Sequence, residues 1–184
     1  RISPSSMTRK QEIPLWPVCR AKLAPHGVRI EVLARRASGA LVYVYRPTLL
    51  TRCIQEERVA AFLRAEGYDP ASLSACIEKL HRRICGTDLQ SQMTGRCSFP
   101  HEIGFFLGYP YEDVVGFIEN EGENYLCSGC WKVYARERDA QSCFCCYKNC
   151  TAEYERLFGE GVPIECLAAV DEDFPAIEAF RAAG

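Results

Sequence analysis

The sequence lacks the segments that direct a protein to or across a membrane. No apolar run approaches the roughly 18 residues that a helix needs to cross a bilayer. No basic start, apolar stretch and small-residue cleavage site marks a secretory signal peptide. We therefore expect a cytoplasmic protein with no membrane partner. The chain opens with Arg1 and its first methionine is Met7, so we expect the natural N-terminus to lie upstream of Arg1.

The signatures of several enzyme and binding classes are missing as well. No GxGxxG, Walker or HExxH pattern is present, so the usual signs of nucleotide binding and of zinc proteases are absent. Lysine and arginine form no dense run with interleaved aromatic residues, so we expect no nucleic-acid partner. Residues 1–98 carry 16 basic and 8 acidic residues, whereas residues 99–184 carry 6 and 16. We interpret this imbalance as attraction between two halves of one folded unit, the alternative being a basic surface for an anionic partner.

The composition of the chain fits one globular domain. Its 184 residues are 48% hydrophobic and 25% charged, which suffices for a single hydrophobic core. We expect a polar tail over residues 1–13, one domain over residues 14–170 and an acidic end over residues 171–184.

The spacing of apolar residues predicts an α+β fold, with a small mixed sheet flanked by helices. Residues 28–35 and 40–46 surround a Ser-Gly turn and are typical of an antiparallel hairpin. Residues 131–134 are expected to be a third strand of that sheet, and residues 164–170 a weaker strand. Apolar residues at three- and four-residue spacing predict helices over 49–65, 70–84, 103–107, a stretch from about 112, and 137–158.

Cysteine is unusually frequent, with twelve in the chain and six of them between Cys127 and Cys150. Because no secretory signal is present, we expect these thiols to be reduced. Cys127-Ser-Gly-Cys130 is a CxxC pair, which can bind a metal ion or form a redox disulfide. Cys143, Cys146 and Cys150 share one face of the last predicted long helix.

These cysteines suggest a metal site with four thiolate ligands, Cys127, Cys130, Cys146 and Cys150. Such a set suits zinc and an iron–sulfur cluster equally well. Two alternatives stay open: the thiols carry out redox chemistry, or they simply pack in the core beside neighbouring aromatic side chains.

His101 is the one histidine in a distinctive setting, at the start of a predicted helix. A helix N-terminus favours the neutral imidazole that acts as a general base or a ligand. With Asp113 or Asn120 as the orienting residue, it suggests a papain-like hydrolase or acyl-transfer centre. The nucleophile would be Cys97 or a cysteine upstream of this chain. The alternative is that His101 only caps its helix.

Several stretches resemble a known family: FPHEIGFFLGYPYEDVVGFIEN (99–120), YLCSGCWKVY (125–134), YKNC (147–150), VYVYRPTLL (42–50) and LAPHGVRI (23–30). Together they are similar to the uncharacterised bacterial family of domain of unknown function 3793, over about residues 22–158. That family has no established activity. The resemblance implies a flavodoxin-like redox protein as a partner.

Members of that family usually open with a segment resembling Cys-Ala-Pro-Thr-Leu-Ala-Gly before the hairpin, and this chain lacks it. A function that needs the cysteine of that segment is therefore in doubt here. From the residues, we favour a cysteine-based accessory protein that handles a metal ion or redox equivalents. A cysteine-dependent enzyme using His101 and a non-catalytic interaction module are the alternatives.

Overall fold

The computed structural model describes residues 15–36, 39–87 and 99–168, which form an α+β fold as predicted. The predicted tail over residues 1–13 and the acidic end over residues 171–184 lie outside these ranges. The elements in chain order are α1 (Trp16–Leu23), the 3-10 turn η1 (Ala24–His26), β1 (Arg29–Arg36), β2 (Gly39–Tyr45), α2 (Pro47–Gln55), α3 (Glu57–Ala65), α4 (Leu73–Ile84), α6 (Ile103–Phe106), α7 (Tyr111–Glu119), β3 (Cys127–Ser128), β4 (Lys132–Val133), α8 (Glu137–Gly159) and α9 (Ile164–Leu167).

The N-terminal hairpin is confirmed. β1 and β2 pair antiparallel, with Arg29 opposite Tyr45 and one irregularity between Val32 and Ala34. Side chains alternate between the two faces of a strand, and here each face packs against a different set of helices. Tyr43 belongs to the main core, whereas Val42 packs with α1 and α9.

The predicted third strand of this sheet is wrong in its pairing. β4 pairs with β3 in a second two-stranded sheet, with Cys127 opposite Val133. The cause is local, because the chain reverses between the two strands and the Gly129 N–H donates to the Trp131 carbonyl at 3.0 Å. A partner only a few residues away costs less loop entropy than a distant one.

Two other predicted elements differ from the structure. The helix expected over residues 49–65 is two helices, because Glu56 takes an extended ψ of 136° and its carboxylate then accepts the N–H of Val59 at 2.9 Å as the cap of α3. The strand expected over residues 164–170 is wrong in its described part. Ile164–Leu167 is a helical turn, which Pro163 initiates with its fixed φ.

The main core lies between the hairpin and helices α2, α3, α4, α6 and α7. Helix α4 illustrates how the sequence specifies it, since its apolar residues recur every three or four positions and its inward face is buried. The buried residues of α4 are Cys76, Ile77, Leu80 and Ile84. None of the helices in the described ranges is long and apolar enough to cross a membrane.

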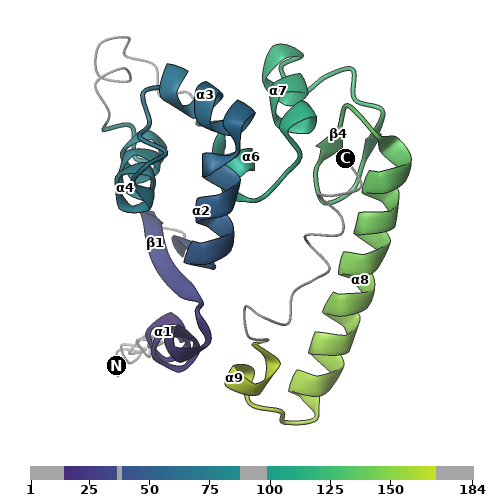
Figure 1. The fold of residues 1–184 in the computed structure, drawn as a ribbon. Helices are drawn as coiled ribbons and strands as arrows, with labels where there is room; N and C mark the ends of the chain where they lie inside the picture. Colours follow the sequence, from purple (N-terminus) through teal and green to yellow (C-terminus); the bar gives the residue numbers. More distant parts are fainter. Residues whose placement is uncertain (1–14, 37–38, 88–98, 169–184) are drawn as a thin grey trace, which may run out of the picture.

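Helix α8 lies apart from this core. Figure 1 shows α8 on one side of the molecule and α2, α4 and the hairpin on the other. Only Ala140 and Cys143 of its 23 residues are buried. The helix is held at both ends, by the β3–β4 hairpin at its start and by α9, which contacts α1, after its end. An ion pair of 3.0 Å between Lys22 and Glu165 joins α1 to α9.

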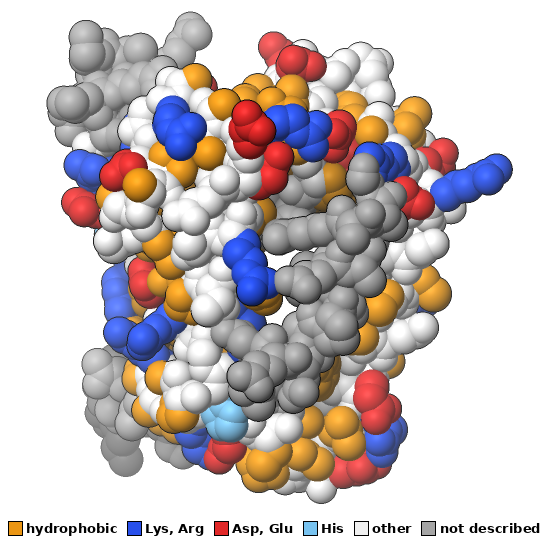
Figure 2. All heavy atoms as spheres, viewed as in Figure 1, with side chains coloured by type: hydrophobic (Ala, Val, Ile, Leu, Met, Phe, Trp, Pro, Cys, Tyr) orange, Lys and Arg blue, Asp and Glu red, His pale blue; other side chains and the backbone are white. Residues whose placement is uncertain are grey.

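The molecular surface mixes charges of both signs. On the face shown in Figure 2, basic and acidic side chains alternate along the upper edge. Apolar side chains gather at the lower end of that face, over α9 and the end of α8, where Phe158 is 63% exposed.

Candidate functional site

Asp113 holds the second hairpin against α7. Its carboxylate is buried and accepts three hydrogen bonds: from the Trp131 indole N–H at 2.7 Å, from the Tyr134 backbone N–H at 2.7 Å and from the Ala135 backbone N–H at 3.0 Å. A carboxylate has about four lone-pair sites, and three of those of Asp113 accept hydrogen bonds from its neighbours. Asp113 therefore connects α7 to the segment between β4 and α8. None of these three hydrogen bonds involves His101.

Glu102 is a second buried carboxylate with a comparable role. It accepts the Tyr68 hydroxyl at 2.7 Å and lies 2.5 Å from the Arg83 guanidinium, which also pairs with Glu66 at 3.1 Å. Burial and the Glu102 charge raise the pKa of the Tyr68 hydroxyl. The pairing with Arg83 compensates the charge of Glu102, so this network fastens the start of α6 to α4.

His101 is exposed at the surface. Its ring lies between Phe99 and Phe117, at centroid distances of 5.8 and 5.0 Å. Asn120 donates to the Gly116 carbonyl at 2.8 Å, which closes the end of α7. Among the described residues, no hydrogen bond joins His101 to Asp113 or Asn120, and Cys97 lies outside the described ranges. The structure therefore does not bring the predicted catalytic set together.

The CxxC turn lies directly on α8. A Cβ atom added to Gly129 would stand 2.3 Å from the Phe144 ring, so only glycine fits at this position. Phe144 also packs edge-on against Trp131, with ring centroids 4.6 Å apart. This contact fixes the turn against the second turn of α8, where the next cysteines of the chain occur.

The two cysteines of the turn point to different neighbours. Cys127 interacts with Glu137 and Gln141 at the start of α8, and partial burial and the Glu137 charge raise its pKa. Cys130 lies close enough to Cys143 to raise the pKa of that thiol by its charge. The turn therefore divides its thiols between two faces of α8.

Four thiols form a row that begins at the turn and follows one face of α8. We call it the thiol row, and its members are Cys130, Cys143, Cys146 and Cys150. Burial raises the pKa of the Cys143 thiol, and the neighbouring Cys146 and Cys130 raise it further. The hydrogen bond and the charge of Cys150 raise the pKa of Cys146. Burial and a hydrogen bond with Cys143 raise the pKa of Tyr147 to about 12.

The thiols in this region are unpaired. No disulfide joins any cysteine in the described ranges. In the same ranges, no group of three or more His, Cys, Asp and Glu side chains has the arrangement of a ready metal site. Of the four predicted ligands, Cys130, Cys146 and Cys150 belong to the thiol row, and Cys127 does not. Cys143 was missing from that set, although its three-residue spacing to Cys146 is visible in the sequence.

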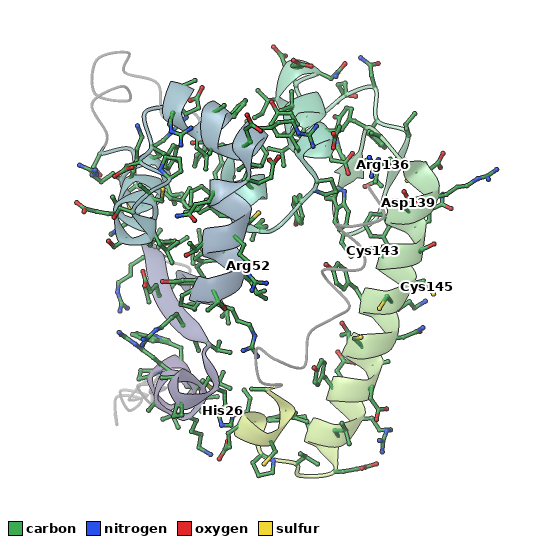
Figure 3. All side chains as sticks on the ribbon, in the orientation of Figure 1. His26, Arg52, Arg136, Asp139, Cys143 and Cys145 are labelled. Carbon is green, nitrogen blue, oxygen red and sulfur yellow. The ribbon has the colours of Figure 1, made fainter. Side chains whose placement is uncertain are left out.

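The thiol row borders a cleft of about 580 Å³ between α2–α3 and α8. Cys53 and Arg52 of α2 line one wall, and Cys143 and Cys146 of α8 line the other. Figure 3 shows Arg52 and Cys143 on the two sides of this space. Clefts of this size bind small molecules in many proteins, so solvent and ligands have access to two of the four thiols.

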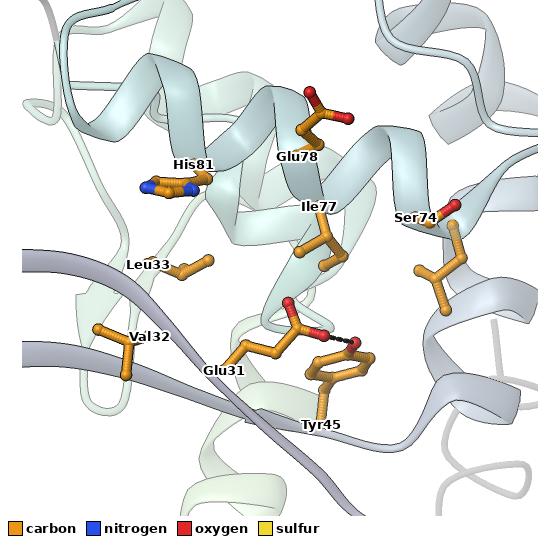
Figure 4. Close-up of a pocket in the computed structure, with 9 residues that line it drawn as sticks. Glu31, Val32, Leu33, Tyr45, Ser74, Ile77, Glu78 and His81 are labelled. Atoms are coloured by element: carbon orange, nitrogen blue, oxygen red, sulfur yellow. Dashed lines mark hydrogen bonds between the residues drawn. The ribbon is translucent and has the colours of Figure 1, made fainter.

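A second hollow, of about 590 Å³, lies between the hairpin and α4 (Figure 4). Its floor is apolar, and its polar groups are Glu31, Glu78, Ser74 and His81. The Tyr45 hydroxyl donates to Glu31 at 2.6 Å on the hairpin side of this hollow. None of the predicted site residues lines it, so we place the candidate site at the thiol row.

Comparison with known proteins identifies the family of this chain. The family described as "Protein of unknown function (DUF3793)" matches residues 2–168, and the chain belongs to it. A search of curated proteins found no match, and a search of solved structures found none either.

Proposed function

We propose that this protein is an accessory protein that binds a soft metal ion through the thiol row. The observation that carries the proposal is the proximity of Cys130 and Cys146 to Cys143, beside an open cleft that Cys143 and Cys146 line. Thiolate sulfur is the ligand that soft and borderline metals prefer, zinc and monovalent copper among them. Cys143 takes the place that Cys127 has in the set expected from the sequence.

The backbone supplies the spacing that such a site needs. Cys143 and Cys146 are three residues apart on one helix, so their Cβ atoms lie about 5–6 Å apart. Cys150 is seven residues beyond Cys143, about 10 Å along the axis, so one ion cannot reach both, and we assign the ion to Cys130, Cys143 and Cys146. Two sulfurs bound to one zinc ion lie farther apart than the two sulfurs of a disulfide, since each Zn–S bond is about 2.3 Å. Rotation of the cysteine side chains about χ1 is the movement that we propose to gather the sulfurs, with the helix unchanged.

Helix geometry also favours a metal over a disulfide. A disulfide needs Cβ atoms about 3.5–4.5 Å apart, which is shorter than the helical spacing. Redox cysteines depend on a low thiol pKa, whereas here burial and neighbouring thiols raise the pKa of Cys143 and Cys146. Thiols that raise one another's pKa release their protons when a metal ion binds among them.

The test is titration of the reduced, full-length protein with Cd²⁺ in the absence of oxygen. We expect one equivalent to bind, with an ultraviolet thiolate-to-cadmium absorption band. Cys130→Ser and Cys146→Ser should each weaken binding by about tenfold or more, because each removes an exposed ligand.

Cys145→Ser is the matched control. Cys145 is exposed on the same helix, about 200° around the axis from Cys143, and its sulfur faces the Asn149 side chain instead. Its replacement should leave cadmium binding unchanged. Failure of the reduced protein to bind one equivalent, or equal weakening in Cys145→Ser, would overturn the proposal. Rapid formation of a disulfide within the row would instead assign it to redox chemistry with a flavodoxin-like partner.

A further inference from the structure

The two strands of the N-terminal hairpin differ sharply in charge. β1 has the sequence RIEVLARR, with four charged residues in eight, whereas β2 has the sequence GALVYVY and no charged residue or proline. Within the described ranges β2 hydrogen-bonds to β1 alone. The opposite edge of β2, which we call the β2 edge, thus has no strand beside it in those ranges.

Two apolar side chains of β2 are exposed, and no backbone hydrogen bond joins residues 39–45 to another described segment besides β1. Leu41 is 42% exposed and Val44 is 54% exposed, although both are large apolar residues. Tyr43 is buried in the main core and Val42 packs with α1 and α9. The strand is therefore anchored by its central residues, while Leu41 and Val44 remain at the surface on either side of them.

Such an edge is rarely left open in a protein that functions as a monomer. An unpaired strand presents free N–H and C=O groups, and natural proteins protect it with charges, proline or a bulge. β1 carries such charges, and the irregularity at Val32 and Ala34 lies on β1 too. β2 has neither protection. Of the two outer edges of this sheet, the β2 edge is therefore the one suited to accept another strand.

We propose that the β2 edge pairs with the same edge of a second copy of this chain, antiparallel about a two-fold axis at Val42. Oligomers with two-fold symmetry require a surface that complements itself, and an uncharged strand meets this condition because no like charges face each other. Pairing about Val42 places Leu41 beside Tyr43 of the second copy and Ala40 beside Val44. The result is one four-stranded sheet, in which both exposed side chains gain apolar neighbours.

The test is sedimentation velocity of the full chain under reducing conditions over a range of concentrations. We expect the unaltered protein to be a dimer. The double variant Leu41→Lys/Val44→Lys should be a monomer, because lysine on an edge strand opposes pairing and the two copies would bring like charges together. Both replaced side chains are exposed, so circular dichroism should show an unchanged fold.

Leu15→Lys/Val18→Lys is the matched control, since Leu15, just before α1, and Val18, on α1, are 78% and 52% exposed and lie outside the proposed contact. This variant should remain a dimer. In the unaltered protein, amide hydrogen exchange over residues 39–45 should slow as concentration rises. A protein that stays monomeric at every concentration would overturn the proposal, even if its β2 edge pairs with a strand of a different protein. So would a dimer that survives Leu41→Lys/Val44→Lys.

Discussion

Helices α6 and α7 and helix α8 both carry reactive side chains, but the two regions use them in opposite ways. In α6–α7 the carboxylates of Glu102 and Asp113 are buried and bonded to neighbouring residues. On α8, the thiols of Cys146 and Cys150 are exposed, and Cys146 lines a cleft. Residues 99–120 are the longest of the stretches that resemble the family, and their buried carboxylates therefore stabilise the fold. The reactive side chains that remain accessible lie on α8.

The largest expected effect tests whether Asp113 is structural. Asp113→Ala leaves one buried and two partly buried N–H donors without their acceptor, and we expect the free energy of unfolding to fall by about 3 kcal/mol. Urea unfolding followed by tryptophan fluorescence measures this loss. Glu119→Ala removes an exposed carboxylate from the same helix and should change stability by less than about 0.5 kcal/mol. A small loss in Asp113→Ala would contradict the structural role.

A smaller effect tests the contact between the CxxC turn and α8. Gly129→Ala places a methyl group against the Phe144 ring, which should destabilise the fold by about 1–3 kcal/mol. It should also weaken cadmium binding, because the turn that carries Cys130 is displaced. Gly159→Ala, at the end of α8, meets no atom within 4 Å and should be neutral or stabilising in thermal unfolding. Equal behaviour of the two variants would show that the turn does not depend on this contact.

The smallest effect concerns an exposed ion pair at the start of α7. Partial burial raises the pKa of Glu112, but the hydrogen bond and charge of Arg58 at 2.6 Å outweigh it and leave the pKa below its usual value. A lowered carboxylate pKa stabilises the fold above the unfolded value and loses this contribution as pH falls through the folded value. The Glu112 side chain is 39% exposed, so solvent screening limits the effect to below about 1 kcal/mol.

Unfolding measured between about pH 6 and pH 3 checks this contribution. The unaltered protein should lose slightly more stability than Glu112→Gln as the pH falls. Glu119→Gln, which removes an exposed carboxylate from the other end of α7, should follow the unaltered protein. Identical pH profiles for all three proteins would show that the ion pair adds nothing.

Local patterns accounted for most of the elements. The alternation around the Ser-Gly turn predicted the hairpin, and the three- and four-residue spacing in α4 predicted both that helix and its buried face. Such patterns fail where an element depends on one residue's backbone or on its partner. Glu56 divides a continuous helical pattern through its ψ angle alone, and β4 pairs with β3 rather than with the hairpin.

The site was harder to predict than the fold, because side chains close in sequence diverge in space. Cys127 and Cys130 share a CxxC pattern, but the turn directs one to Glu137 and the other to Cys143. The position of His101 near a helix start suggested a catalytic role, while its ring lies at the surface between two phenylalanines. The spacing of residues along the chain does not predict which hydrogen-bond donors lie beside a buried carboxylate such as Asp113.

The sequence by itself determined the family, the α+β class, the hairpin and the face of α8 on which Cys143, Cys146 and Cys150 lie. These follow from motifs and from the fixed periods of strands and helices, which depend only on nearby residues. Only the tertiary structure decided that the carboxylates of Asp113 and Glu102 are bonded to buried neighbours and that Cys130 joins the thiol row. It also decided that, among the described residues, no second strand pairs with the β2 edge. These depend on long-range packing, which brings together residues whose separation along the chain carries no signal of their contact.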